Sequence, residues 1–305
     1  MDRNSIYYRQ VQLLLQLIPF VARHDCFALK GGTAINLFVR DLPRLSVDID
    51  LVFLPMLERD KALRAITNAL TDIGDAIKKR MPDAVLIEAF RSRDDALRLT
   101  VNRSGVQIKI ELSPVLRGTV FDPQLMSVRE SVENEFGFAE IHVVSHADLY
   151  AGKICAALDR QHPRDLFDVK ALLENEGLTD ELRKALIIYM ISHNRPISEL
   201  LRPRFKNISG LYHGEFLNMS EQRVELAELE SVREQLVQLI NTAFTAEERR
   251  FLLSFKRLAP EWGLLGLGAV ENLPAVRWKQ MNLTKMNTDK RNEAYRKLNN
   301  VLGIG

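Results

Sequence analysis

The fold is decided by a stretch near the N-terminus that reads Phe27-Ala28-Leu29-Lys30-Gly31-Gly32-Thr33, followed by Ser46-Val47-Asp48-Ile49-Asp50-Leu51. The first part predicts a short strand that turns at two glycines into a helical segment over 34–39. The second part belongs to a predicted strand over 47–54, because aliphatic residues alternate there with polar ones. A strand, a glycine turn, a helical segment and a second strand indicate a domain that mixes sheet and helix.

The two halves of the chain have different patterns. We expect helices over 6–23 and 59–79, strands over 85–90, 97–101 and 106–112, and a hairpin turn at 102–105. Beyond residue 144 helical patterns dominate, over 145–158, 163–176, 180–192, 221–244, 246–258 and 289–302. The sequence therefore predicts an α+β fold, with a mixed sheet flanked by helices in a domain over 1–144 and an α-helical domain over 145–305.

The composition is that of a globular protein in water. Of the 305 residues, 46% are hydrophobic and 27% charged, and 42 Lys and Arg face 40 Asp and Glu. This near-balance neither demands nor excludes a polyanionic partner. The two cysteines, Cys26 and Cys155, have no metal-ligand spacing. We expect no signal peptide, no membrane-spanning helix and a cytoplasmic location.

The glycine turn is a candidate phosphate site. Gly31 and Gly32 let backbone approach a ligand closely. The helical segment that follows points free N–H groups and the positive end of its dipole at the same place. A triphosphate would suit this turn, and Thr33 could add a hydroxyl donor. The alternative is a glycine turn that touches no ligand.

Carboxylates next to the turn are candidate metal ligands. Asp48 and Asp50 project from the same face of their strand, because side chains alternate with a period of two. Two close carboxylates repel each other unless a cation lies between them, and Mg²⁺ is usually held by such oxygens together with substrate phosphates. Glu111 completes a three-carboxylate site if its strand lies beside that of Asp48. The alternatives are solvated aspartates and an ordinary half-buried strand with a charged face.

A third group of candidates lies in the helical half. Lys153 has small neighbours in the sequence, which leave room for phosphates to approach its ammonium group. Asp165 follows in the first turn of the helix over 163–176, where the helix dipole alone favours an acid. Arg164 and Asp168 have the spacing of a simple surface ion pair. The spacing of these residues does not distinguish a phosphate site from ordinary helix-end and ion-pair contacts.

Taken together in this order, the motifs resemble those of a known family. They are Gly31-Gly32-Thr33, Ser46-Val47-Asp48-Ile49-Asp50, Ile108-Lys109-Ile110-Glu111, Arg117-Gly118-Thr119-Val120, Leu149-Tyr150-Ala151-Gly152-Lys153 and Asp159-Arg160-Gln161-His162-Pro163-Arg164-Asp165-Leu166-Phe167-Asp168. The chain resembles the AbiEii/AbiGii nucleotidyltransferase toxins of the polymerase-β-like superfamily, the toxin half of type IV toxin–antitoxin systems. The glycine turn and the aspartate pair are shared across the superfamily, whereas the lysine helix and the Arg-Asp-x-x-Asp segment are more specific to the family.

The resemblance implies roles for individual residues. Asp48 and Asp50 would hold Mg²⁺ or Mn²⁺, with Glu111 as a third ligand or as the activating base. Lys153 would bind phosphate in the active-site cleft, and an essential aspartate is assigned to Asp165 first and Asp168 second. The candidates for contact with the nucleoside triphosphate are Lys30, Gly31, Gly32, Thr33, Ser46, Lys109 and Lys153.

The resemblance also implies the reaction and the partners. A nucleoside monophosphate would pass from the triphosphate to the 3′ end of tRNA, which would block translation and support phage defence. A basic C-terminal region with Lys285, Lys290 and Arg296 could follow an RNA backbone, or be a solvated face. An antitoxin encoded by an adjacent gene would neutralise the activity. The alternatives are transfer to a small molecule such as an aminoglycoside, and a non-catalytic relative that binds protein or DNA.

Overall fold

Strands and helices occupy different parts of the chain in the computed structural model, which describes residues 5–220 and 223–303. Within these residues every strand of the sheet precedes residue 144, and helices dominate afterwards. The chain divides into two compact units. One consists of Met1–Ser145 and Met219–Gln222, and the other of His146–Asn218 and Arg223–Gly305. The expected α+β fold is confirmed.

The described residues of the first unit form a seven-stranded mixed sheet with the strand order β3-β4-β5-β2-β1-β7-β6. β2 runs parallel to β5, and β1 runs parallel to β7, whereas the other neighbours are antiparallel. The strands are β1 (Phe27–Lys30), β2 (Asp48–Phe53), β3 (Val85–Glu88), β4 (Arg98–Arg103), β5 (Val106–Leu112), β6 (Gln124–Ser127) and β7 (Glu140–Val143).

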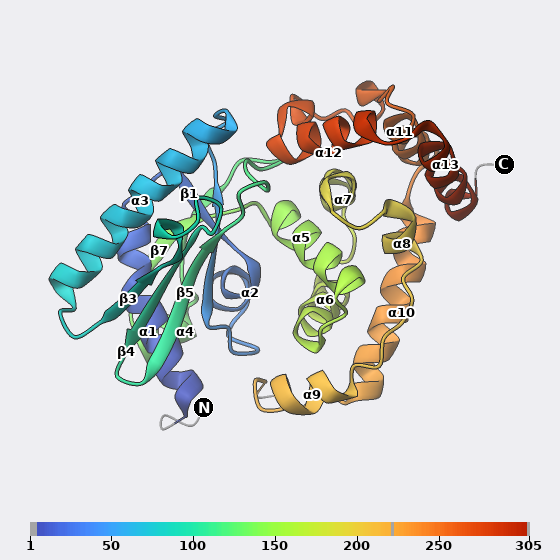
Figure 1. The fold of residues 1–305 in the computed structure, drawn as a ribbon. Helices are drawn as coiled ribbons and strands as arrows, with labels where there is room; N and C mark the ends of the chain where they lie inside the picture. The colour runs from blue at the N-terminus through green and yellow to red at the C-terminus, as the bar shows by residue number, and fades with distance from the viewer. Residues whose placement is uncertain (1–4, 221–222, 304–305) are drawn as a thin grey trace. The chain divides into compact units, whose positions relative to one another are not determined.

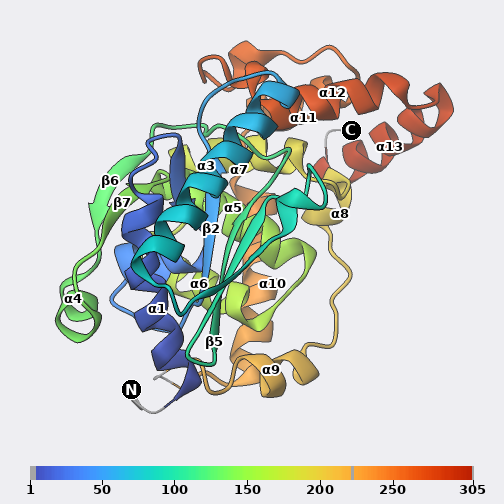
Figure 2. The same ribbon diagram turned by 60° about the vertical axis from the view of Figure 1, so that its left-hand side comes forward.

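Two long helices cover one face of this sheet, α1 (Ile6–Val21) and α3 (Arg59–Arg80) (Figure 1 and Figure 2). Ser5 caps α1 by accepting a hydrogen bond from the Tyr8 N–H at 3.1 Å. Both helices are amphipathic, and their apolar residues are buried with Ile49, Leu51 and the alternate residues of β5. This packing leaves the polar residues of β2 and β5 on the opposite face of the sheet.

The glycine turn leads into a short helix of unusual form. One turn of α-helix, α2 (Gly31–Thr33), widens directly into a π-helical segment, η1 (Ala34–Val39), in place of the ordinary helical pattern expected over 34–39. The Asn36 side chain is fully buried and donates to the Gly32 carbonyl at 2.8 Å. A short 3₁₀ turn, η2 (Ala89–Arg91), and helix α4 (Glu130–Phe136) complete the first unit.

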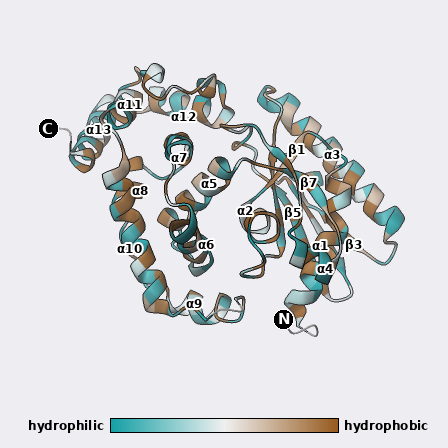
Figure 3. Ribbon diagram, turned by 180° about the vertical axis from the view of Figure 1, so that it is seen from behind, coloured by the Kyte–Doolittle hydropathy of each residue, from teal (hydrophilic) through white to brown (hydrophobic). Residues whose placement is uncertain are grey.

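The second unit is helical throughout its described residues. α5 packs against both α6 and α7, and the ring of Tyr189 on α7 lies where Gly152 of α5 has no side chain. Most of the helices carry hydrophobic and hydrophilic faces (Figure 3). The elements are α5 (His146–Asp159), α6 (Pro163–Asn175), α7 (Asp180–Ser192), α8 (Ile197–Leu201), α9 (Ser209–Glu215), α10 (Leu226–Ala243), α11 (Ala246–Lys256), η3 (Trp262–Leu264), η4 (Val270–Asn272), α12 (Pro274–Lys285) and α13 (Thr288–Leu302).

Several elements differ from the expectations. The strands β6 and β7 and the helices α4, α8, α9 and α12 have no counterpart among the predicted segments. β6 lies at an edge of the sheet and buries none of its four residues, so it has no alternating pattern to recognise. The helix predicted over 221–244 begins at Leu226, and residues 221–222 lie outside the described residues. None of the described helices combines the length and hydrophobicity that crossing a membrane requires.

Candidate functional site

The two glycines of the β1–α2 turn stand where other side chains come very close. Gly31 has a left-handed backbone with φ at 76°, and a Cβ atom there would collide with the carboxylate of Asp50. A Cβ on Gly32 would lie 2.8 Å from the Ser46 hydroxyl oxygen and from an Arg44 guanidinium nitrogen. The turn therefore requires glycine at both positions, and it brings the Asp50 carboxylate against the backbone that leads into α2.

Thr33 holds the turn against the start of β2. Its side chain is completely buried, and its hydroxyl donates to the Asp48 carbonyl oxygen at 2.5 Å, with the Ser46 hydroxyl 3.1 Å away. The hydroxyl that the sequence suggested for the triphosphate is thus used inside the protein, because burial leaves it no access to a ligand. Thr33 therefore positions the turn relative to Asp48, and the Ser46 hydroxyl is a second partner of the Thr33 hydroxyl.

Four charged residues form one row across the sheet. Lys30 on β1 pairs in register with Asp50 on β2, Asp50 pairs with Glu111 on β5, and Glu111 pairs with Arg98 on β4. Because directly opposed residues share a face, all four side chains project from the face opposite α1 and α3. In the neighbouring row, Asp48 pairs with Lys109. The sheet therefore brings Asp48, Asp50 and Glu111 to one face, as the sequence predicted, with Lys30 and Lys109 beside them.

The fit of these residues to a divalent metal rests on two carboxylates. An oxygen of Glu111 accepts from the Arg98 guanidinium at 2.5 Å, so that this carboxylate is engaged by a cation of its own. Within residues 5–220 and 223–303, no three His, Cys, Asp or Glu side chains gather closely enough to hold a metal ion. The assignment of Glu111 as a third ligand or as the activating base stays a prediction, beside the pair Asp48 and Asp50. Two carboxylates combined with substrate phosphates are a usual ligand set for Mg²⁺.

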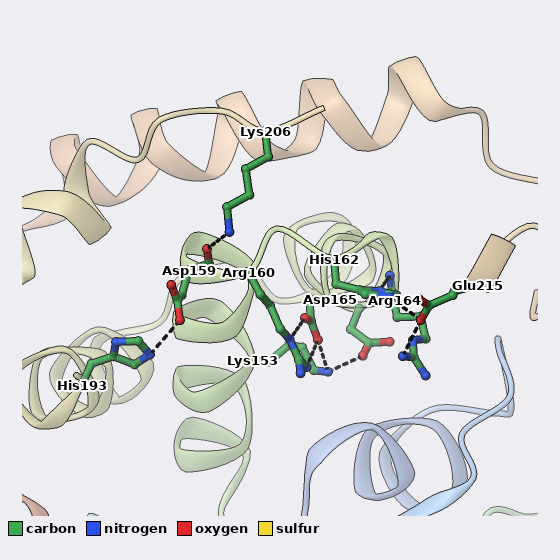
Figure 4. A network of polar contacts seen from close by, with 10 residues as sticks. Lys153, Asp159, Arg160, His162, Arg164, Asp165, His193, Lys206 and Glu215 are labelled. Atoms are coloured by element: carbon green, nitrogen blue, oxygen red, sulfur yellow. Dashed lines mark hydrogen bonds and ion pairs between the residues drawn. The ribbon is translucent and has the colours of Figure 1, made fainter. Parts of the chain in front are cut away.

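The second unit holds a buried ionic cluster, drawn in Figure 4. The ammonium group of Lys153 on α5 lies 2.8 Å from one oxygen of Asp165 and 2.9 Å from one of Asp168, both on α6. Arg160 contacts Asp165 through two guanidinium nitrogens, at 2.5 and 2.9 Å. Lys153, Asp165 and Asp168 are almost completely buried, whereas the Arg160 side chain is 63% exposed.

The electrostatics of this cluster determine what each group can do. Burial alone would raise the pKa of Asp165, but Lys153 and Arg160 together outweigh it and hold that pKa well below its ordinary value. Lys153 is enclosed by two carboxylates, and its expected role as a phosphate ligand stays a prediction. The group of this cluster that reaches solvent is Arg160, which had no role among the expected site residues. Its position five residues before Asp165 is the signal that could have identified it.

The loop between α5 and α6 fixes the place of Arg160. Gln161 has a left-handed backbone with φ at 55° and is buried, where its amide donates to the Arg204 carbonyl and accepts from the Lys206 N–H, each at 2.9 Å. His162 caps α6 by accepting from the Arg164 N–H at 3.1 Å, and burial lowers its pKa against the opposing effect of Glu215. These bonds hold the backbone of the loop that follows Arg160.

The basic C-terminal region is only partly available to a ligand. Lys285 is exposed at the end of α12, and Lys290 and Arg296 are exposed on α13. Lys279 instead turns inward and donates to the His193 carbonyl oxygen. Burial, followed by the like charge of Lys256, lowers the pKa of Lys279 to about 8. An exposed Trp278 stands next to it.

Comparisons with known protein families and structures show what this chain is similar to. The family model described as "Nucleotidyl transferase AbiEii toxin, Type IV TA system" matches residues 12–281. The fold is similar to that of the nucleotidyltransferase toxin MenT4 of Mycobacterium tuberculosis, with a TM-score of 0.61 and 14% sequence identity over 99% of this chain and 95% of that one. No curated protein sequence matches this one closely.

Proposed function

Because the chain belongs to the AbiEii family of nucleotidyltransferase toxins of type IV toxin–antitoxin systems, we propose that it transfers a nucleoside monophosphate from a nucleoside triphosphate to an acceptor hydroxyl. The observation that carries the proposal is the contact of the Asp50 carboxylate with the Gly31 turn, beside Asp48 on the same strand face. Carboxylates and a backbone turn of this kind serve a phosphate ligand and the cation that accompanies it.

The reaction is a displacement at the α-phosphorus. An oxygen of the acceptor forms a bond to the α-phosphorus, and the bond from that phosphorus to the bridging oxygen of the pyrophosphate breaks. The proton of the acceptor hydroxyl passes to a carboxylate, for which Glu111 is our candidate because it lies next to Asp50. The Gly31–Gly32 turn accepts the phosphate chain, and Lys30 and Lys109 supply positive charge beside it.

Asp48 and Asp50 would hold a divalent cation, Mg²⁺ or Mn²⁺, which when bound supplies positive charge for the phosphate oxygens. Thr33 bonds the backbone of Asp48, and the Asp50 carboxylate lies against Gly31, so both aspartates stand beside the glycine turn. Within the helical unit, Asp165 bonds both Lys153 and Arg160, and the planar guanidinium of Arg160 suits phosphate oxygens. Asp165, which bonds both cations, is the aspartate that we assign as essential.

We propose the 3′ end of tRNA as the acceptor. The support is the family resemblance together with the exposed cations of α12 and α13, Lys285, Lys290 and Arg296, which can contact a phosphate backbone. Transfer to tRNA would block translation and could act in phage defence. Membership in a toxin–antitoxin family implies a cognate antitoxin as partner and a nucleotide as substrate.

The experiment that tests the proposal measures transfer of label. The purified protein is incubated with each of the four α-labelled nucleoside triphosphates, Mg²⁺ and total tRNA, beside the variants Asp48→Ala and Asp50→Asn. We expect tRNA to be labelled by the wild type and not by either variant, although the circular dichroism spectra agree. Equal labelling by the variants would contradict the assignment of the aspartates. Labelling of an aminoglycoside, with tRNA left unlabelled, would contradict the acceptor.

A further inference from the structure

A second charged site lies in the first unit, away from the carboxylates. A pocket of about 870 Å³ opens between the C-terminal parts of α1 and α3 and the hairpin end of β4. Its lining includes four cationic side chains, Arg23, Lys79, Arg80 and Arg103, and no carboxylate. These cations come from three separate segments of the chain.

Most of this positive charge is uncompensated within the described residues 5–220 and 223–303. Arg103 is the exception, since it bonds Asp83 at 2.8 Å and Gln16 at 3.1 Å. Arg23, Lys79 and Arg80 are exposed and form no ion pair there; Arg23 lies over the Phe20 ring at 5.8 Å. Basic residues at the C-terminal ends of α3 and α1 complement the dipoles of these helices, but that does not explain Arg103, which belongs to β4.

The form of the pocket indicates the class of ligand. α1 and α3 both meet it with their C-terminal ends, so neither helix offers the free N–H groups that enclose a single phosphate. The available donors are long, exposed side chains spread around an open pocket. Such donors suit several phosphates in succession, held by charge and sensitive to salt, as in a nucleic-acid backbone.

The pocket is remote from the transfer site. Arg98 pairs with Glu111, whereas Arg103 pairs with Val106 at the hairpin end of the same two strands. Because these two arginines are five residues apart on one strand, their side chains project from opposite faces, about 16 Å apart along the strand. A free nucleotide is too short to occupy both places, whereas a polynucleotide is long enough.

We infer that this pocket, formed by Arg23, Lys79, Arg80 and Arg103, binds the phosphate backbone of an RNA at a distance from the carboxylates. The inference rests on the proposed function for the nature of the acceptor, but the binding needs neither triphosphate nor metal. The pocket anchors a part of the RNA that does not react.

The test is a titration of fluorescently labelled tRNA without nucleotide or divalent metal, followed by anisotropy over a series of salt concentrations. The pocket variant is Lys79→Gln with Arg80→Gln. The matched control is Lys61→Gln with Arg64→Gln, which removes two exposed cations nearer the other end of α3. We expect the pocket variant to bind roughly tenfold more weakly at 0.1 M salt, with a salt slope smaller by about 1 to 2, and the control to bind like the wild type.

Equal binding by the two variants would overturn the inference. Complete displacement of the RNA by millimolar inorganic phosphate would show a free-anion site instead, and displacement by polyglutamate as effective as by unlabelled RNA would show a site for an acidic protein. The Asp48→Ala protein should bind RNA like the wild type. If the pocket variant binds RNA more weakly but the protein transfers no nucleotide, the binding site is supported and the proposed function is contradicted. If the protein transfers nucleotide to tRNA but the pocket variant binds RNA like the wild type, the proposed function is supported and the binding site is contradicted.

Discussion

At the scale of single residues, the contact between Gly31 and Asp50 matters most for the proposed chemistry. A side chain at Gly31 meets the Asp50 carboxylate, and the left-handed backbone adds strain. Both effects arise only when a Cβ atom is added. They can be separated experimentally because Gly105 has almost the same backbone angle, with φ at 77°, and no described atom within 4 Å of an added Cβ.

We predict that Gly31→Ala abolishes nucleotidyl transfer, whereas Gly105→Ala leaves it unchanged. Each substitution should lower the free energy of unfolding by about 1–2 kcal/mol through backbone strain. The substitution at Gly31 also displaces the Asp50 carboxylate. Urea denaturation measures the stability, and label transfer measures the activity. An active Gly31→Ala protein would show that the position of Asp50 against the turn is not needed.

A second prediction at this scale concerns pH and Lys279. Its pKa is lowered to about 8 by burial and by Lys256, whereas an unfolded chain restores a value near 10.4. Between these two values the unfolded state binds more protons, so that stability rises with pH across this window. In Lys279→Met this contribution is absent. The stability of the variant relative to the wild type should therefore fall from pH 8 to pH 10, as measured by urea denaturation at each pH. A constant difference would contradict the lowered pKa.

At the scale of elements, the ionic cluster joins α5 to α6. Lys153 lies between two carboxylates that are each 1% exposed, so its removal takes away the cation that contacts both of these buried charges. We predict that Lys153→Met lowers the free energy of unfolding by about 3–5 kcal/mol. Lys170→Met is the control, because its partners Glu174 and Glu228 are about half exposed and stay in contact with water without it, and it should lose about 0–1 kcal/mol.

This prediction changes how a loss of toxicity should be interpreted. A Lys153 variant that no longer arrests growth could be unfolded rather than catalytically inactive, so the purified protein has to be measured by denaturation. Adding Asp168→Asn to Lys153→Met removes one of the buried charges that Lys153 contacts, and it should recover part of the lost stability. A Lys153→Met protein as stable as the Lys170→Met control would show that the buried pairs contribute little.

At the same scale, local patterns predicted some elements and missed others. β5 and α7 have the bounds that the sequence predicted, 106–112 and 180–192. Both signals are local, because they are the alternation of residues in β5 and the Thr179 cap of α7. The edge strand β6 has no such signal. The widening of α2 into a π-helical segment also has none, since it accompanies the contacts of the glycine turn with β2.

At the scale of the whole molecule, the binding of the triphosphate and Mg²⁺ can be tested through stability, without knowledge of the acceptor. A nucleoside triphosphate that binds the folded protein together with Mg²⁺ should stabilise it by about 2.7 kcal/mol at a concentration one hundred times its dissociation constant. We predict a rise in the melting temperature of the wild type and none for Asp48→Ala. Thermal denaturation with triphosphate alone, Mg²⁺ alone and both measures the effect. The same rise in the variant would contradict a role for Asp48 in binding.

The sequence by itself determined the α+β class, the glycine turn and the aspartate pair, because strand alternation, helical periodicity and glycine turns are properties of neighbouring residues. Only the tertiary structure decided the partners of the charges. The register of β4 and β5 places Arg98 beside Glu111, where the two form an ion pair. The packing of α5 on α6 encloses Lys153 between Asp165 and Asp168. Spacing cannot show such pairs, because each depends on how distant segments meet in space.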